Sequence, residues 1–438
     1  MFPNPQDALP LPRKPDVDQY RTLAKALVRE ARTGDDAIRE WATRWIAALV
    51  RQSGIVITRH LPVRIEGWSK RVAEYAIKEL RGKPTPTLTK AQLVIARSQG
   101  FESWPKFSRH LQQLAESRSR VSRFEMAADA IVNGDAARLK RLLRENPTLV
   151  RARSTREHGA TLLHYTSANG VEGYRQKTPK NIVAITTLLL DAGADVEAAC
   201  HVYGSDCTTL GLTATSIHPA NAGTMDELLQ LLLDRGAQMD SQGGAGRAHS
   251  MVFACLANGQ RGAARFLASR GAPVDFVSAA ALDRLEDVQQ HFNRDGSRKP
   301  GVSQERLQEA YRYACGYGAA RVVEFLLERG ADMAEHTGDG CTGTHYAVMS
   351  GSVETVKLLL RRNPPLEGTT THGRSVLFHA LRSATRGKAT DAYVQILEAL
   401  IAAGAEIPEK HPPVNATIDA LLERHGSHAD ANSHWFHE

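Results

Sequence analysis

The second half of the chain contains a motif that returns about every 33 to 36 residues once insertions are removed. The segment TGTHYAVMSG from Thr342 aligns with TLLHYTSANG from Thr161. Looser copies begin at Thr208, Ser250, Glu309 and Ser375, and degenerate copies begin near Glu125 and Val274. One such unit cannot bury its apolar face alone, so it must stack on its neighbours. The period therefore predicts a row of similar units rather than a single compact core.

Each copy leads into an amphipathic segment that ends in apolar residues and a turn, as in VEFLLERGADM at 323–333. This pattern predicts two helices per unit, the first capped by a hydroxyl such as that of Thr342 or Thr161. We expect the apolar residues to bury against the next unit. We also expect glycine in the left-handed conformation just past four helix ends, at Gly193, Gly236, Gly271 and Gly330.

The T-x-x-H frame at Thr342–His345 and Thr161–His164 resembles the signature of ankyrin repeats. In that family the histidine holds the loop backbone beside the start of the first helix. The resemblance therefore implies a structural role for His345 and His164. Equivalent positions in the other copies hold Gly211, Phe253, Arg312 and Phe378. These replacements exclude a catalytic or metal-binding role that would need a histidine in every unit.

Longer segments resemble a group of bacterial cytoplasmic ankyrin-repeat proteins. Segments 204–223 and 307–332 are similar to their repeats, and segments 16–30 and 89–111 are similar to the helical N-terminal region that many of them carry. The resemblance implies an all-α fold, an ankyrin-repeat α-solenoid of about eight repeats, some of them degenerate, preceded by a small helical domain. It implies a binding role and no particular substrate.

We predict three parts along the chain. Residues 1–118 form a basic helical N-terminal domain, residues 122–408 form the ankyrin-repeat array, and residues 409–438 form a C-terminal capping helix and a His-rich tail. The capping helix is expected near Asn415–Arg424, and the tail from His425 is expected to be disordered. Segment 293–306 is expected to be a flexible join at which the array bends or breaks.

Helix signals recur through the N-terminal part. Asp16 is placed to cap a helix that ends before Gly34, and Thr89 is placed to open another that ends at Gly100. Ser103 is placed to cap a third helix, with Pro105 in its first turn. Three aromatic residues are spaced to form one buried cluster, namely Phe101, Trp104 and Phe107.

Charge is distributed unevenly along the chain. Residues 1–123 contain 23 Lys and Arg against 12 Asp and Glu, a net charge of +11, whereas the remainder contains 32 against 36, a net charge of −4. A basic region could bind nucleic acid, and segment 106–123 is its most concentrated stretch. However, acidic residues interleave with the basic ones elsewhere, and no helix-turn-helix or zinc-finger spacing is present. We therefore expect the N-terminal region to be solvated or to dock on the acidic array, and nucleic acid is not the expected partner.

Three features bear on the cellular compartment. No apolar run approaches the roughly 18 residues of a membrane-spanning helix. The first residues lack the apolar core of a signal peptide. The 5 cysteines are odd in number and scattered, which favours free thiols in a reducing cytosol. We predict a cytoplasmic protein with no membrane partner.

Motifs for catalysis, cofactors and metals are weak. His218, Pro219 and Gly223 match part of the H-P-F-x-x-G-N-G-R motif of Fic domains, but Asp226 stands where the motif has its arginine. The spacing of Cys200, His201 and Cys207 is not that of a zinc site. The tail could bind metal weakly through His425, His428, His434 and His437. We predict no catalytic residue, no cofactor site and no metal site.

The sequence favours non-catalytic recognition of another protein through a concave face and projecting loops. Insertions at 171–181, 216–223 and 382–392 are expected to project along one edge of the array. Nine residues are predicted at loop tips that contact the partner, namely Arg156, His158, His201, Tyr203, Asp206, His336, Asp339, His372 and Arg374.

Two other functions stay open. A small-molecule binder or enzyme could use the inserted edge, with Tyr174, Lys177, His218 and Arg386 near one another. A nucleic-acid-associated regulator could use the basic N-terminal domain, and its affinity would fall steeply with salt.

Overall fold

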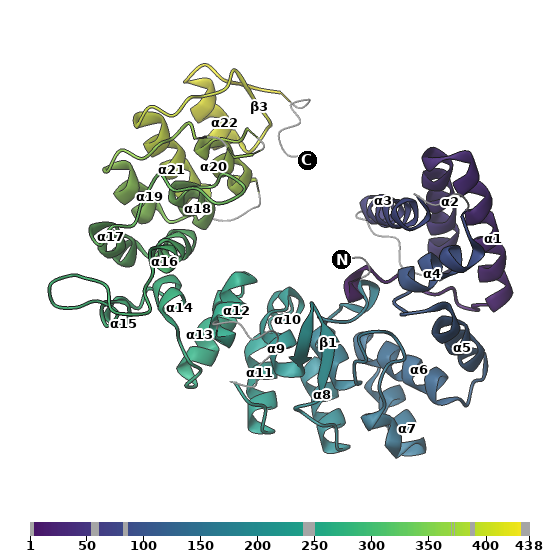
Figure 1. The fold of residues 1–438 in the computed structure, drawn as a ribbon. Helices are drawn as coiled ribbons and strands as arrows, with labels where there is room; N and C mark the ends of the chain where they lie inside the picture. Colours follow the sequence, from purple (N-terminus) through teal and green to yellow (C-terminus); the bar gives the residue numbers. More distant parts are fainter. Residues whose placement is uncertain are drawn as a thin grey trace. The chain divides into compact units, whose positions relative to one another are not determined.

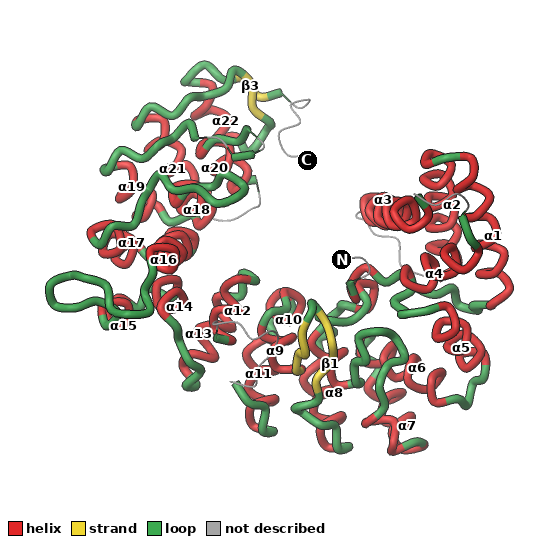
Figure 2. Tube along the Cα trace, in the orientation of Figure 1, coloured by secondary structure: helices red, strands yellow, loops and turns green. Residues whose placement is uncertain are grey.

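The computed structural model of the protein describes residues 4–53, 61–81, 86–239, 250–368, 370–371, 373–385 and 390–430. These residues are mostly helical, with 22 α-helices and two short two-stranded sheets (Figures 1 and 2). The chain divides into two compact units, Met1–Ala272 and Pro273–Glu438. The predicted helical class is confirmed, and the strands are an addition to it.

The first unit begins with a short 3₁₀-helix and five α-helices. They are η1 (Pro5–Asp7), α1 (Val17–Thr33), α2 (Asp35–Ser53), α3 (Leu61–Leu80), α4 (Leu88–Ser98) and α5 (Trp104–Ala115). Asp16 caps α1 as predicted, because its carboxylate accepts a hydrogen bond from the Asp18 amide at 3.1 Å. Thr87 caps α4 through its contact with the Lys90 amide, so this helix begins slightly earlier than the predicted start at Thr89.

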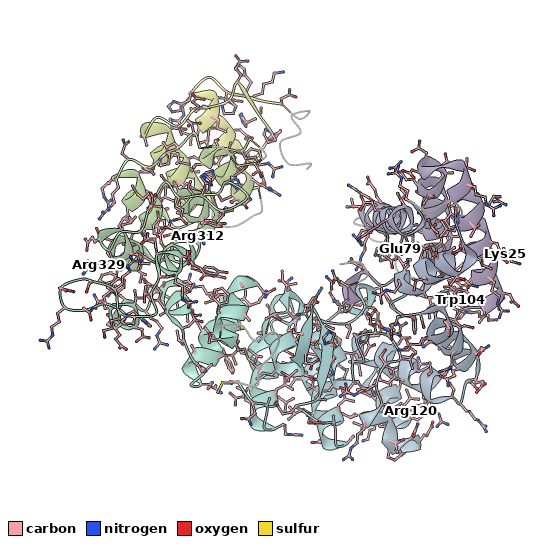
Figure 3. All side chains as sticks on the ribbon, viewed as in Figure 1. Lys25, Glu79, Trp104, Arg120, Arg312 and Arg329 are labelled. Carbon is pink, nitrogen blue, oxygen red and sulfur yellow. The ribbon has the colours of Figure 1, made fainter. Side chains whose placement is uncertain are left out.

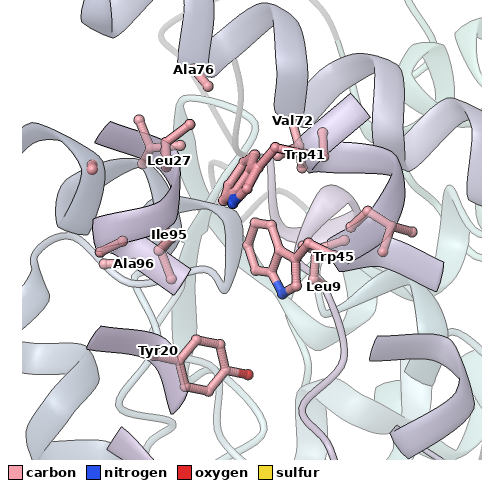
Figure 4. Packing of buried hydrophobic residues seen from close by; sticks show 14 of the residues in the cluster. Leu9, Tyr20, Leu27, Trp41, Trp45, Val72, Ala76, Ile95 and Ala96 are labelled. Carbon is pink, nitrogen blue, oxygen red and sulfur yellow. The ribbon is translucent and has the colours of Figure 1, made fainter. Parts of the chain in front are cut away.

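The core of these helices combines aliphatic side chains with large aromatic ones. Trp41 and Trp45 on α2 have ring centroids 5.2 Å apart, and Figure 4 shows them among side chains of neighbouring helices. In the predicted cluster at the start of α5, Phe101 and Phe107 are buried and Trp104 is partly buried. Ser103 stands at the N-cap position of α5, but its side chain makes no capping hydrogen bond, so the predicted cap is wrong. Phe107 lies 5.2 Å from Phe101 and 5.9 Å from Trp104 between ring centroids. Burial of these large rings adds apolar surface to the aliphatic part of the core.

The rest of the first unit consists of short helices arranged in packed pairs. The elements are α6 (Arg120–Val132), α7 (Ala136–Glu145), η2 (Pro147–Arg151), η3 (Leu163–Ser167), η4 (Gly173–Arg175), α8 (Ile182–Asp191), β1 (Ala199–Val202), β2 (Ser205–Thr208), α9 (Thr209–Ala214), α10 (Ile217–Asn221), α11 (Met225–Asp234), α12 (Met251–Ala257) and α13 (Arg261–Ser269). Helix α6 pairs with α7, α9 with α11, and α12 with α13, while α7, α8, α11 and α13 contact one another in order. This stacking buries an apolar face that no single pair could cover.

One expected α-helix is a 3₁₀-helix instead. The segment that follows Thr161 forms η3, and Ala168 at its end adopts a left-handed φ of 50°. The Thr166 hydroxyl donates to the Leu163 carbonyl and the Ser167 hydroxyl donates to the His164 carbonyl, both at 2.7 Å. Such local bonds compete with the helical pattern. The periodic spacing of apolar residues carries no sign of these hydroxyl-to-carbonyl bonds, so it predicted an α-helix here.

The second unit repeats the same arrangement. Its elements are α14 (Phe276–Ala281), α15 (Leu285–Gln289), α16 (Gln304–Gly316), α17 (Ala320–Glu328), α18 (Gly343–Ser350), α19 (Val353–Leu360), α20 (Val376–Ala384), α21 (Thr390–Ala402), β3 (Lys410–His411), α22 (Ala416–Glu423) and β4 (His428–Ala429). Helices α14, α16, α18 and α20 contact one another in order, and α15, α17, α19 and α21 form a second row. The helix predicted at the C-terminal end is α22, which Asn415 caps and which packs on α21.

Two details of the second unit differ from expectation. Segment 293–306 is not a bare join, because Phe292 before it packs edge-on against Phe325 with ring centroids 5.1 Å apart, and the segment folds into its own turn. The tail is ordered at its start, since His428 lies in β4 beside Lys410. His434 and His437 lie outside the described residues.

The boundary between the compact units falls after Ala272, earlier than segment 293–306. The division of the chain into three parts stays a prediction.

Glycines behave as predicted at the helix ends. Gly193, Gly236, Gly271 and Gly330 have φ between 90° and 95°. Within the described residues, no helix has the length and apolar character needed to cross a bilayer.

Replacing Gly343 with alanine is expected to destabilise the protein. A Cβ at this first residue of α18 would lie 2.5 Å from the Tyr311 ring, which is fully buried. Overpacking of this kind costs about 1–3 kcal/mol. Gly262→Ala is the control, because its Cβ would meet nothing within 4 Å on helix α13 and should stabilise by about 0.5–1 kcal/mol. Thermal unfolding followed by circular dichroism measures both. An equal or higher midpoint for Gly343→Ala would contradict the prediction.

Candidate interaction surface

Two histidines hold the starts of repeat helices, as predicted from the T-x-x-H frame. The Thr342 amide donates to His345 Nδ1 at 3.1 Å, and the Thr161 amide donates to His164 Nδ1 at 3.1 Å. Because Nδ1 of His164 accepts, its proton is on Nε2, which faces the Cys207 carbonyl at 3.3 Å. Burial lowers the pKa of His164 to about 4 and also lowers the pKa of His345. The role of both is structural.

His345→Ala is expected to lower the free energy of unfolding by about 1–3 kcal/mol, because the Thr342 amide would be left buried without its partner. Urea unfolding followed by circular dichroism measures the loss. His336→Ala serves as the control, since His336 is exposed in the preceding loop. If the two variants unfolded at the same urea concentration, the holding role of His345 would be wrong.

The hairpin of β1 and β2 presents three of the predicted loop-tip residues. Tyr203 and Gly204 form its turn with φ of 55° and 78°, the pattern of a tight two-residue turn. His201 and Asp206 are exposed partners across the hairpin, with 3.0 Å between Nδ1 and Oδ1. The Tyr203 hydroxyl donates to Asn169 Oδ1 at 2.7 Å while 48% of the residue stays exposed. These side chains therefore stand on a fixed frame.

The loops before α18 and α20 carry the predicted residues of the second unit. His336 and Asp339 are exposed, and the Asp339 carbonyl accepts a hydrogen bond from the Thr371 amide at 2.8 Å. The Thr337 hydroxyl donates to the Asp339 carboxylate and lowers its pKa. The Arg374 guanidinium lies 5.2 Å from the centre of the Phe378 ring. His372 lies outside the described residues.

Arg156 and His158 are not at exposed loop tips, so that prediction is wrong for both. They are 3% and 4% exposed. Arg156 forms ion pairs with Glu125 at 2.6 Å and with Glu172 at 2.9 Å, and His158 Nε2 lies 3.4 Å from Glu172. A buried charge needs a partner of opposite sign, and Glu125 and Glu172 supply two such partners from distant parts of the sequence.

The ion pairs continue through a second arginine. Arg175 contacts Glu125 at 2.7 Å and Asp129 at 2.7 Å. Burial by itself would raise the pKa of Glu125, but Arg156 and Arg175 outweigh it and hold that pKa at about 2. The same balance keeps the pKa of Glu172 well below its ordinary range. We call Glu125, Asp129, Arg156, Glu172 and Arg175 the ion core.

The ion core joins three parts of the first unit. Glu125 lies on α6, Arg156 lies in the loop before η3, and Arg175 lies on η4. The Arg156 guanidinium also lies 5.5 Å from the centre of the Phe101 ring in the N-terminal region. Arg97 pairs with Glu157 at 2.7 Å at the same junction. One feature of the sequence points to this core, the pair of opposite charges Glu172 and Arg175 inside an insertion. The other members of the ion core lie on α6 and in the 153–161 loop, and the spacing of residues in the sequence does not predict that they contact this pair.

The insertions differ in how far they project. In segment 171–181, Val171, Glu172 and Arg175 are buried, so the first part of the insertion folds inward, whereas Lys177 and Lys180 stay exposed. In segment 216–223, the Ile217 side chain is 55% exposed beside the buried Pro219. Segment 382–392 is described only in part.

The alternative small-molecule site would consist of Tyr174, Lys177, His218 and Arg386. No hydrogen bond or ion pair of the described residues joins Tyr174, Lys177 and His218 to one another. The Tyr174 hydroxyl accepts a hydrogen bond from Arg156 at 3.3 Å, and burial raises the pKa of Tyr174 to about 12. Burial lowers the pKa of His218, with a further contribution from Arg64. Arg386 lies outside the described residues.

The cysteines of β1 and β2 face each other across the hairpin, since Cys200 is the register partner of Cys207. Strand alternation places His201 on the opposite face from Cys200. Burial raises the pKa of Cys200 to about 12 and also raises the pKa of Cys207. Across the described ranges, no group of three or more His, Cys, Asp or Glu side chains is arranged to hold a metal ion.

Comparison with known families identifies part of the array. A family model described as ankyrin repeats (3 copies) matches residues 311–411. Residues 311–411 contain ankyrin repeats. They comprise the C-terminal part of α16 and the helices from α17 to α21, and they include the His345 position. Among curated proteins, none matches this chain. Ankyrin repeats indicate a role in protein interaction.

Proposed function

We propose that the protein recognises another protein without catalysis, through loop tips carried on about eight stacked ankyrin units. The packed helix pairs outside residues 311–411 are assigned to the same repeat type on the basis of their stacking. Membership of the group of bacterial ankyrin-repeat proteins remains a prediction from sequence resemblance. The cytoplasmic location remains a prediction from that resemblance and from composition.

The hairpin of β1 and β2 is the main support for this proposal. Its exposed Tyr203 is fixed by Asn169, and its backbone is tied to the preceding loop where the His201 amide donates to the His158 carbonyl at 3.0 Å. A partner that binds such a preformed surface loses little conformational entropy of this chain. Tyr203 also combines apolar area with a polar end, which is typical of residues that dominate protein interfaces.

Affinity capture from the native cell extract tests the proposal. The intact chain is compared with a Tyr203→Asn/Asp206→Lys variant, in which asparagine tolerates the positive φ of the turn. Glu145→Lys is the control, because Glu145 is exposed at the end of α7 and none of the described residues pairs with it. We expect the intact chain and the control to capture the same protein and the hairpin variant to lose at least 90% of it, roughly 1.4 kcal/mol of binding or more.

Capture of no protein by the intact chain, together with a large thermal shift from a small metabolite, would replace this proposal with the small-molecule alternative. Capture that is equal for all three chains would keep a binding role but remove the hairpin from it.

A further inference from the structure

An open cavity lies where the N-terminal helices meet the first helix pair of the array. It has a volume of about 370 Å³ and is lined by residues of α5, of α6, of η2 and of the loop after η2. Figure 3 labels Arg120, which lies at the start of α6 on the rim of this cavity. We call this cavity the arginine groove.

Three arginines line the groove without a carboxylate to neutralise them. Arg120 and Arg151 are exposed, and among the described residues neither side chain has a hydrogen bond or an ion pair. Arg153 donates to the carbonyls of Gly159 and Ala199 at 2.9 and 2.7 Å, which fixes its side chain and leaves its charge uncompensated.

The acidic residue in the lining does not change this balance. Glu125 offers one oxygen to Arg156 at 2.6 Å and the other to Arg175 at 2.7 Å, so both oxygens are occupied from the buried side. The N-terminus of α6 adds a partial positive charge, because Arg120 is its first residue. The field in the groove is therefore positive.

The groove also has an apolar side. Val121 and Phe124 line it and are 7% and 3% exposed, so they form a wall rather than a protruding patch. The Phe124 ring is held edge-on to Tyr165, with 6.0 Å between centroids. A ligand that places an anion beside the arginines can thus place an apolar group against this wall.

We infer that the arginine groove binds an acidic peptide segment of a partner protein, with an oxyanion beside Arg120 and Arg151 and an apolar side chain against Val121 and Phe124. This inference rests on the proposed protein-binding function. Guanidinium groups present parallel N–H donors that match both a carboxylate and a phosphate, so the oxyanion is either Asp or Glu or a phosphorylated side chain. A cavity of this volume accommodates a few side chains. It offers no row of aromatic faces on which nucleic-acid bases would stack.

A bead library of random nine-residue peptides, half of them carrying one phosphoserine, tests the inference with the full chain. We expect bound beads to be enriched at least threefold in Asp and Glu, or in phosphoserine, next to Leu, Ile or Phe. The relative enrichment of the two classes tells which oxyanion is preferred. The best peptide is then resynthesised with a fluorescent label and measured by anisotropy.

An Arg120→Glu/Arg151→Glu variant is expected to bind the labelled peptide at least tenfold more weakly. The matched control is Arg141→Glu/Arg144→Glu, which makes the same charge change on exposed positions of α7. Circular dichroism confirms that both variants are folded. The inference fails if bound beads show no acidic enrichment, or if the control loses as much affinity as the groove variant.

Failure of the inference can be separated from failure of the proposed function. If affinity capture with the Arg120→Glu/Arg151→Glu variant still recovers the partner of the intact chain, the protein-binding function stands and the groove is not its site. If the intact chain captures no protein and selects no peptide, both fail.

Discussion

Arg156→Ala is expected to lower the free energy of unfolding of the first unit by about 3–5 kcal/mol, the range seen when one member of a buried ion pair is removed. The substitution would leave Glu172 buried with its closest arginine gone and would remove one of the two arginines that contact Glu125. Buried carboxylates without such partners become protonated or draw in water, and both responses cost stability.

Urea unfolding followed by tryptophan fluorescence measures this loss, because four of the five tryptophans lie in the first unit, namely Trp41, Trp45, Trp68 and Trp104. The control is Arg235→Ala in the same unit. Arg235 pairs with Asp191 at 2.8 Å, but the Asp191 side chain is 61% exposed. An exposed pair of this kind contributes about 0–1 kcal/mol. A loss for Arg156→Ala no larger than that of Arg235→Ala would mean that the ion core does not hold the unit together.

Lowering the pH from 6.5 to 4 is also expected to lower the free energy of unfolding. Each of two buried histidines is expected to contribute up to about 3 kcal/mol to this loss. Burial lowers the pKa of His110 and of His164 to about 4, from an ordinary value of 6.5. The folded chain therefore binds fewer protons than the unfolded chain in this window. The two neutral histidines therefore stabilise the folded chain fully above their pKa in the unfolded chain, 6.5. This stabilisation is lost as the pH falls through their pKa in the folded chain, about 4.

Glu125 adds a second window at lower pH. Its pKa of about 2 lies below the ordinary 4.5, so its contribution is present above pH 4.5 and is lost as the pH falls toward 2. Midpoints of urea unfolding at half-unit steps of pH separate the two windows.

A His110→Gln/His164→Gln variant is expected to show a shallower loss of stability between pH 6.5 and 4 than the parent chain, even if it is less stable at every pH. His201→Gln is the control, since His201 is exposed on the hairpin. An unchanged slope in the double variant would show that other groups carry the pH dependence.

The repeat frame was predictable because its causes are local. The spacing of apolar residues around Leu358–Leu360, the glycines after helix ends and the T-x-x-H frame each act within one unit, so they can be read along the chain. The N-terminal cluster of Phe101, Trp104 and Phe107 was predictable for the same reason. The 3₁₀-helix η3 was missed because hydroxyl-to-carbonyl bonds of Thr166 and Ser167 leave no trace in periodicity.

The candidate surface was predictable only in part. The side chains predicted at loop tips are exposed on the β1–β2 hairpin and in the loop before α18, namely His201, Tyr203, Asp206, His336 and Asp339. Arg156 and His158 occupy similar positions in the sequence, yet they are buried because Glu125 and Glu172 approach them from other elements. Sequence position places a residue in a loop but does not say which charges face it.

By itself, the sequence determined the kind of unit at residues 311–411, the glycine turns after helix ends and the structural role of His345 and His164, because each depends on residues a few positions apart. Only the tertiary structure decided which charged residues are buried and which face water. Burial of a charge depends on partners that are distant in sequence, and Arg156 becomes part of a core while Arg120 and Arg151 line an open groove because only the former has carboxylates within reach.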